Sequence, residues 1–271
     1  MAGEKVDLTG EKETLLITLY GKALESRRPH SRLKDRFAEA AVGAIDYDFS
    51  RLKVDENLAT GLAIRALALD DWTRAFLARH ADAVVLHLGC GLDTRVFRID
   101  PPVRVEWFDV DYPEVAELRR KLYPPREGHH VVAASVTEPG WLEAAPRDRP
   151  TMIVAEGLTP YLRAQDGIRL ARDLVRHLAG GELAFDAYSR FGLRILKLNP
   201  SFHATGAEVH WSIEDPRELE AQVPGLHLLE DVAAYRPEHA AGMRPLAGLF
   251  IRLWQHVPAL RKIGRLLRYR F

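Results

Sequence analysis

The spacing of apolar positions changes near residue 80. From Glu11 to about His80, apolar residues recur every three to four positions, which predicts helices. The stretch 44–53, rich in aromatic and acidic residues, is expected to be a loop. The pattern thus predicts a helical N-terminal segment over residues 1–80. Its helices are expected after residue 11, after Ser31, over 58–69 and over 72–80.

Beyond residue 80, short apolar runs alternate with helix-length segments. Such alternation is typical of parallel strands joined by crossover helices. We therefore predict an α/β fold with a Rossmann-like, doubly wound sheet over residues 81–271, and one structural domain overall. The runs that predict strands lie at 84–88, 103–108, 131–134, 152–155 and 182–187.

Composition excludes several kinds of partner. Among the 271 residues, 38 Lys and Arg balance 38 Asp and Glu, so no overall positive field would attract nucleic acid. No apolar run approaches the length needed to span a membrane, and the N-terminus lacks the apolar core of a secretory signal. The single cysteine, Cys90, excludes an intramolecular disulfide and a multi-cysteine metal site. We therefore expect a cytoplasmic protein without a metal, a nucleic-acid partner or a membrane partner.

The first predicted strand ends in a glycine turn. Ligands of doubly wound sheets bind at the carboxyl ends of the strands, so this turn is a candidate site. Gly89 and Gly91 permit a tight turn and a close approach of a ligand to the backbone. A dinucleotide fingerprint would need a third glycine where Thr94 stands. Asp93, at the start of the next helix, disfavours a phosphate but suits a cationic ligand.

Acidic residues follow two other predicted strands. Asp109 and Asp111 lie about twenty residues beyond the glycine turn, where a carboxylate can accept hydrogen bonds from both hydroxyls of a ribose. Alternation along the strand places both on one face, and either can fill this role. Glu156 follows a buried strand and needs a cationic partner, because an unpaired buried carboxylate is costly. Arg65, on a helix before the turn, is one candidate, and a cationic ligand is another.

These residues, in this order, resemble the leucine carboxyl methyltransferase family and its bacterial branch of polyketide-type O-methyltransferases. The resemblance implies a class I methyltransferase that uses S-adenosylmethionine and releases S-adenosylhomocysteine. It also implies a seven-stranded sheet with an antiparallel last strand, placed at 265–271, and an N-terminal helical lid. The segments that carry it are TLYGKALES (18–26), IDYDF (45–49), GCGLDTR (89–95), FDVDYPEV (108–115), AEGLTPYL (155–162) and RYRF (268–271).

The resemblance also implies a role for individual residues toward the methionine part and the ribose. Arg65 resembles the family arginine that pairs with the methionine carboxylate. Glu156 resembles the acid near the amino group, and Asp111 the acid on the ribose. Lys22 resembles a basic residue that faces the cofactor from the N-terminal helices. A cofactor with a carboxylate, an ammonium and a sulfonium suits this mixture of charges.

Four further residues complete the implied cofactor site. Gly89 and Gly91 resemble the glycines whose backbone borders the methionine part. Ser135 and Val136 resemble the pair around the adenine. Many relatives have Asp where Ser135 stands, so the hydrogen bond of that Asp to the adenine amino group is not implied here.

The acceptor follows from the chemistry of the family. Relatives in both branches methylate carboxylates, and a carboxylate is ionised at neutral pH, so it needs no general base. A phenol would need a base such as a histidine. We expect methyl transfer to a small organic acid of secondary metabolism, with no catalytic side chain; the alternative acceptor is a phenol or hydroxyl of a polyketide-like metabolite. Substrate contacts are expected from Tyr20, Tyr161, His203 and Trp211, the last two within the acceptor segment 188–211.

Two other functional classes fit the same sheet. A nicotinamide oxidoreductase is disfavoured by Thr94, and the cofactor that raises the melting temperature would identify it. A relative that binds S-adenosylmethionine without catalysis would show no turnover. Recognition of a phosphatase tail, as in the eukaryotic branch, is disfavoured because the motifs resemble the bacterial branch.

Overall fold

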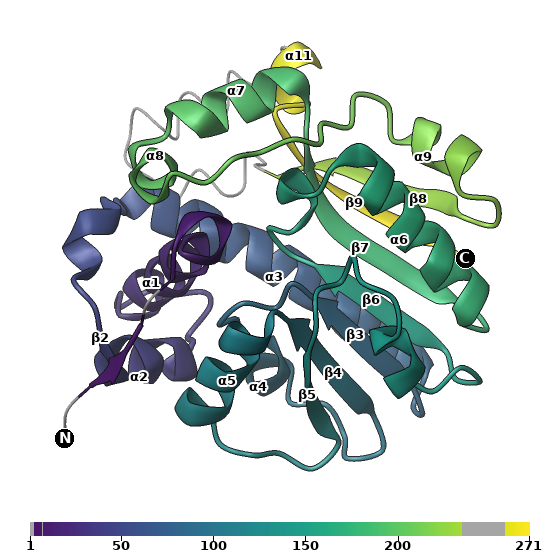
Figure 1. Cartoon of the computed structure of the whole chain (residues 1–271), viewed down its shortest axis with the longest axis horizontal. Coiled ribbons are helices and arrows are strands. Elements are labelled where there is room, and N and C mark those ends of the chain that lie inside the picture. Colours follow the sequence, from purple (N-terminus) through teal and green to yellow (C-terminus); the bar gives the residue numbers. More distant parts are fainter. Residues whose placement is uncertain (1–2, 7, 235–257) are drawn as a thin grey trace.

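A mixed sheet forms the centre of the computed structural model, which describes residues 3–6, 8–234 and 258–271 (Figure 1). In this part of the chain the sheet has seven strands in the order β5-β4-β3-β6-β7-β9-β8. β9 runs antiparallel to β7 and β8, whereas the other pairs are parallel. This arrangement confirms the predicted doubly wound sheet with a reversed last strand. The strands are β3 (Val84–Leu88), β4 (Glu106–Asp111), β5 (His129–Ala133), β6 (Thr151–Ala155), β7 (Gly181–Tyr188), β8 (His227–Ala233) and β9 (Gly264–Arg270).

Two strands differ from the prediction. β4 starts at Glu106, because Glu106 is the residue that pairs with the first residue of β3, and the apolar Val103 lies exposed in the preceding turn. Asp109 and Asp111 therefore lie inside the strand. β8 was not predicted, since its residues alternate between exposed and half-buried at the edge of the sheet and form no continuous apolar run.

The described part of the N-terminal segment contains three α-helices: α1 (Thr14–Ser26), α2 (Arg36–Ala44) and α3 (Glu56–Arg79). The two helices predicted over 58–69 and 72–80 are one continuous helix, α3. Asp70, which interrupts the apolar pattern there, is buried and accepts hydrogen bonds from Arg95 and Arg98. The predicted loop 44–53 holds the short strand β2 (Ile45–Asp46), which pairs with β1 (Glu4–Lys5), and a 3-10 helix, η2 (Phe49–Leu52).

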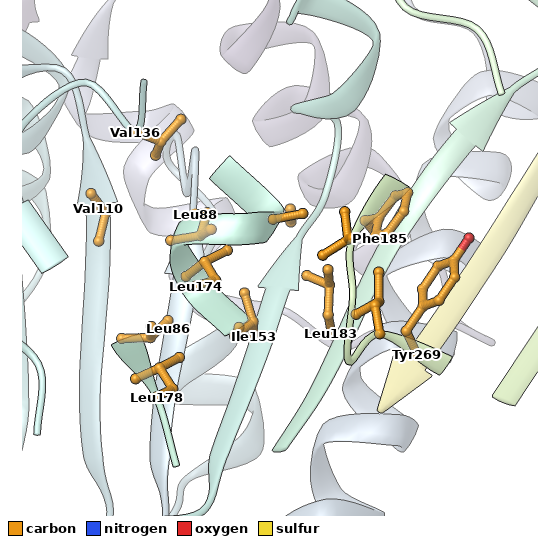
Figure 2. Packing of buried hydrophobic residues seen from close by; sticks show 14 of the residues in the cluster. Leu86, Leu88, Val110, Val136, Ile153, Leu174, Leu178, Leu183, Phe185 and Tyr269 are labelled. Carbon is orange, nitrogen blue, oxygen red and sulfur yellow. The ribbon is translucent and has the colours of Figure 1, made fainter. Parts of the chain in front are cut away.

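Helices cover both faces of the sheet. On one face, Leu69 and Phe76 of α3 pack with Val85, Trp107 and neighbouring strand residues. On the other face, α6 (Ala164–His177) and α9 (Arg217–Gln222) pack on the second core. Figure 2 shows this second core, where Leu174 of α6 lies over Leu88 and Ile153. α3 is thus one of the helices that cover the sheet, although it lies in the N-terminal segment before residue 80.

The remaining described elements are helices of ten residues or fewer that connect those already given. They are 3-10 helices η1 (Gly10–Lys12), η3 (Trp141–Ala144) and η4 (Thr159–Tyr161), and α-helices α4 (Arg95–Ile99), α5 (Pro113–Leu122), α7 (Arg190–Leu198), α8 (Pro200–Thr205) and α11 (Pro258–Arg261). α1 packs on α2, α3 and α8, as Figure 1 shows. In the described ranges, no helix combines the length and apolar character needed to cross a membrane.

Removing a side chain from the central strand should destabilise the whole domain. Leu86 is fully buried, so Leu86→Ala should lower the free energy of unfolding by about 2–5 kcal/mol, because it leaves a cavity and loses apolar burial. Urea unfolding followed by circular dichroism measures this change. Val103→Ala is the control: its side chain is 56% exposed, and the change should stay within about 0.5 kcal/mol. Equal losses in the two variants would contradict the packing described.

Candidate functional site

A cavity of about 660 Å³ lies at the carboxyl ends of the parallel strands, bounded on the other side by α1, α3, α7 and α8. The predicted cofactor residues come together there from five separate segments of the chain. α3 contributes one, the glycine turn after β3 two, β4 one, the segment after β5 two and the segment after β6 one. They are Arg65, Gly89, Gly91, Asp111, Ser135, Val136 and Glu156.

Both glycines of the turn are required by geometry. Gly89 and Gly91 have φ angles of +58° and +51°, in the left-handed region that other residues adopt at a cost. A Cβ atom at Gly89 would lie 2.9 Å from Cδ1 of Leu158, and one at Gly91 would lie 3.1 Å from Cβ of Leu15. The turn is therefore packed closely against Leu158, in the segment after β6, and against Leu15 of α1.

Asp111 holds the turn from β4. Its Oδ2 accepts a hydrogen bond from the Gly91 amide at 2.7 Å, and its Oδ1 accepts one from the Tyr112 amide at 2.8 Å. Burial raises the pKa of Asp111, while these amides act in the opposite direction. Each oxygen keeps a second lone pair for a ligand hydroxyl. Asp109 is buried below and does not line the cavity, so of the two candidate acids only Asp111 faces it.

Glu156 is surrounded by cations from three helices. Its Oε1 lies 3.1 Å from Nζ of Lys22 and 3.2 Å from Nε of Arg65, and its Oε2 lies 2.5 Å from Nη2 of Arg95. Burial alone would raise the pKa of Glu156, but these charges outweigh burial and lower the pKa to about 2. Arg65 also pairs with Asp186 at 3.0 Å. The predicted pairing of Glu156 with a cation is thus present within the chain itself.

These ion pairs belong to a larger buried cluster. Lys22, only 1% exposed, also contacts Oδ2 of Asp93 at 3.0 Å, and Arg98 contacts Oδ1 of Asp93 at 2.6 Å. Among the residues that the structure describes, the connected groups comprise four cations and five carboxylates, a net charge of −1. Because a buried net charge is costly, this cluster suits a ligand that brings a positive charge. Its members are Lys22, Arg65, Arg95, Arg98, Asp35, Asp70, Asp93, Glu156 and Asp186.

Sequence reasoning missed Arg95 and Asp186 as members of this cluster. Arg95 lies inside the GCGLDTR motif, but an arginine in the first turn of a helix usually extends into solvent. Asp186 lies near the carboxyl end of β7, a position that sequence reasoning singled out for ligand-binding residues without assigning Asp186 a role. Thr94 does not cap α4 with its side chain; its hydroxyl donates a hydrogen bond to Asp35. The Ser135 hydroxyl pairs with that of Thr137 at 2.9 Å.

Among the four predicted substrate contacts, the structure places Tyr161 on the cavity wall. Its ring stacks on Phe202, and burial raises its pKa. The other three do not line the cavity. Tyr20 stacks on Phe49 in the core of the N-terminal helices, and the ring of Trp211 lies against the backbone of Gly167 in α6. His203 is exposed on α8.

The acceptor segment 188–211 does line the cavity, through members that sequence reasoning did not select. Apolar residues of α7 and a polar pair near α8 form this wall, and His210 lies on it as well. No periodic signal distinguishes such residues from packed ones, because the wall is built by short helices and a loop. The wall residues from this segment are Tyr188, Gly192, Ile195, Leu196, Asn199, Ser201, Phe202, Gly206, Glu208 and His210.

Glu156→Gln should change how stability depends on pH. Near neutral pH the variant should lose about 3–5 kcal/mol of unfolding free energy, because Lys22, Arg65 and Arg95 then face a neutral amide in place of the carboxylate they share. The folded-state pKa, about 2, lies below the ordinary 4.5, so the wild-type stabilisation is present above pH 4.5 and is lost as the pH falls toward 2.

Urea unfolding at pH 6 and pH 3 measures this dependence. The difference between wild type and Glu156→Gln should shrink at the lower pH. Glu143→Gln is the matched control. Glu143, on η3, forms an exposed ion pair with Arg147, so its substitution should have little effect on stability at either pH. A difference between wild type and Glu156→Gln that stays constant with pH would contradict the role given to these ion pairs.

Comparison with known proteins identifies the family. The profile of the family described as leucine carboxyl methyltransferase matches residues 16–175. The chain is 47% identical to the tetracenomycin polyketide synthesis O-methyltransferase TcmP of Streptomyces glaucescens, over 99% of this chain and all of that protein. It is 34% identical to the S-adenosyl-L-methionine-dependent methyltransferase dpfgK of Gibberella zeae, over 83% of each.

A solved structure shows the same fold. A DUF574 family protein from Streptomyces avermitilis has a TM-score of 0.60 at 15% identity, with 95% of this chain and 96% of that chain covered. The family profile spans more than half of the chain, and the interpretation as a nicotinamide oxidoreductase is dropped. The chain therefore belongs to the leucine carboxyl methyltransferase family and is an S-adenosylmethionine-dependent O-methyltransferase, as its motifs predicted.

Proposed function

We propose that the chain methylates a carboxylate oxygen of a small organic acid and so forms a methyl ester. The observation that carries this proposal is the pairing of the acids at the charged end of the cavity. Glu156 and Asp93 are each held by buried cations, Lys22 and Arg98 among them. Carboxylates held in this way are poor bases for a phenol at neutral pH. A carboxylate acceptor needs no base, because it is already ionised.

The cofactor-binding roles form part of the same proposal. Arg65 pairs with the carboxylate of the methionine part, Glu156 accepts from its amino group, and Asp111 accepts from the ribose hydroxyls. The backbone at Gly89 and Gly91 borders the methionine part, and Ser135 and Val136 flank the adenine. Their position in one cavity supports these roles. The net charge of −1 in the buried cluster also suits a cofactor that carries an ammonium and a sulfonium.

The acceptor half of the cavity favours the transfer step. When bound, S-adenosylmethionine supplies an electrophilic methyl group: the C–O bond to the acceptor forms, the C–S bond breaks with its electron pair left on sulfur, and the sulfonium becomes a neutral sulfide. Leu158, Leu162, Leu196 and Phe202 line the cavity and exclude water. Opposite charges attract more strongly where water is excluded, and the walls hold the acceptor oxygen in line.

The N-terminal segment, residues 1–80, supplies the lid in this proposal through α1, whereas its last helix, α3, packs on the sheet. α1 places Leu15, Thr18 and Lys22 on the cavity wall, opposite the strand ends. The lid keeps water from the reacting groups. The enzyme works on a small molecule of secondary metabolism in the cytoplasm, where its buried, unpaired Cys90 stays reduced.

A phenol acceptor is the second candidate, and one observation favours it. His210 lies on the cavity wall, and its Nε2 is 4.0 Å from a carboxylate oxygen of Glu208. A histidine beside an acid can remove a proton from a phenol. The two acceptors therefore differ in their dependence on His210.

An acceptor panel tests the proposal. With methyl-labelled S-adenosylmethionine, aromatic carboxylic acids should give labelled products that mild alkali hydrolyses, as methyl esters require. Matched phenols should give no stable ether. His210→Gln should change ester formation less than about twofold, because no proton is removed. Label found only in alkali-stable ethers, with loss of activity in His210→Gln, would overturn the carboxylate assignment. Absence of any turnover would favour a cofactor-binding relative without catalysis.

Calorimetry tests the cofactor roles. Arg65→Ala and Glu156→Gln should each weaken S-adenosylhomocysteine binding at least about tenfold, a loss of about 1.4 kcal/mol, because each removes a charged partner of the methionine part. Arg74→Ala is the control, since Arg74 lies on the same helix with its side chain partly exposed. Unchanged affinity in both site variants would rule out the assigned roles.

A further inference from the structure

A buried histidine lies beneath the cavity and has no role in the proposed reaction. His87, the residue before the last in β3, is 1% exposed and does not line the cavity. Its Nδ1 lies 3.0 Å from Oδ1 of Asp109 on β4, and its Nε2 lies 3.1 Å from Nη1 of Arg95 on α4. Oδ2 of Asp93 also faces Nε2, at 3.8 Å, which is beyond hydrogen-bond distance.

The two partners of His87 fix its protonation state. Arg119, His129 and His87 lower the pKa of Asp109 well below its usual value, although burial alone would raise it, so Asp109 is ionised and accepts hydrogen bonds. Arg95 is a guanidinium and donates. Both contacts are satisfied when Nδ1 carries the proton and Nε2 keeps its lone pair. Burial lowers the pKa of His87 and thus favours this neutral form.

His87 stands in the middle of a continuous chain of contacts. On one side, Nη2 of Arg95 donates to Oε2 of Glu156 at 2.5 Å. On the other side, Asp109 pairs with Arg119 of α5, whose Nη1 donates to the carbonyls of Gly91 and Asp93 at 2.8 Å each. The hydroxyl of Tyr123 donates to the carbonyl between them, that of Leu92, at 2.7 Å. The chain thus joins the Glu156 carboxylate to two carbonyls of the glycine turn, those of Gly91 and Asp93.

We propose that His87, as the Nδ1-protonated neutral tautomer, is a positioning residue that couples the Glu156 carboxylate to the glycine turn. The lone pair of Nε2 accepts a hydrogen bond from Nη1 of Arg95, and this contact orients the guanidinium so that Nη2 donates to Oε2 of Glu156. Without this acceptor, a buried N–H of Arg95 lacks a partner and the guanidinium reorients. The inference rests on the proposed cofactor role of Glu156, and it goes further by linking the two walls of that site.

The tautomer is tested without cofactor or activity. Long-range proton–nitrogen correlation spectra of the 15N-labelled full chain at pH 7 should show one buried histidine with a proton on Nδ1 and none on Nε2. His87→Phe identifies the signal by its disappearance, and if that variant does not fold, His87→Gln serves the same purpose. A proton on Nε2, or a doubly protonated ring, would overturn the proposal.

The coupling is tested by a double-mutant cycle on S-adenosylhomocysteine affinity. His87→Phe keeps a ring but removes both nitrogen atoms, and should weaken binding about tenfold, as expected when a charged group loses a hydrogen bond. Combined with Glu156→Gln it should add little further loss, because both changes break the same chain. Fully additive losses, or an unchanged affinity in His87→Phe, would overturn the coupling.

A control separates positioning from simple loss of stability. His129 donates to Asp109 at 2.7 Å but lies outside the chain between Glu156 and the turn. His129→Phe should lower the melting temperature and leave the affinity within about twofold of wild type. An equal loss of affinity in this variant would show that stability alone governs binding. The failure of the proposed cofactor site is recognised separately, since Glu156→Gln would then leave the affinity unchanged.

Discussion

Glu156 carries its negative charge inside the protein, and three helices supply the cations that hold it there. Lys22 comes from α1, Arg65 from α3 and Arg95 from α4. A buried carboxylate without such partners would be protonated or would destabilise the fold. Its ion pairs therefore attach the N-terminal helices to the end of β6, at the edge of the sheet where the cavity opens. Under the proposed cofactor roles, stability and ligand recognition depend on the same contacts.

The sheet topology explains why these groups meet. The parallel strands β5, β4, β3, β6 and β7 all end at one edge, so residues from 89 to 188 converge there although they are far apart in sequence. The turn after β3 is fixed by Asp111 through an amide and by Arg119 through carbonyls. The cluster keeps a net charge of −1, and a cation that enters the cavity completes it. Under the proposed function, a site that lacks one positive charge is a physical basis for selecting a sulfonium cofactor over a nucleotide.

The sequence predicted most strands of the sheet, and it selected seven residues that the fold brings together in one cavity, because both leave local signals. Buried strands read as apolar runs, and the turn and strand-end acids are recognisable in order. Contacts between residues far apart in the sequence were harder to predict, because they leave no local pattern. Asp70 interrupts the apolar pattern and suggested two helices, yet Arg95 and Arg98 stabilise it inside α3. Trp211 was expected to contact the acceptor, but its ring packs on Gly167. Which of these positions the ring takes depends on the three-dimensional arrangement of the surrounding helices and loop, which the sequence pattern does not reveal.

The central claim is that the buried cluster receives the methionine end of the cofactor. A crystal structure with S-adenosylhomocysteine bound tests it most directly. The account predicts the ligand amino group within about 3.2 Å of Glu156, its carboxylate on Arg65 and a ribose hydroxyl on Asp111. A ligand whose methionine part lies away from Glu156 and Arg65, with the ion pairs among Lys22, Arg65 and Glu156 unchanged, would contradict it.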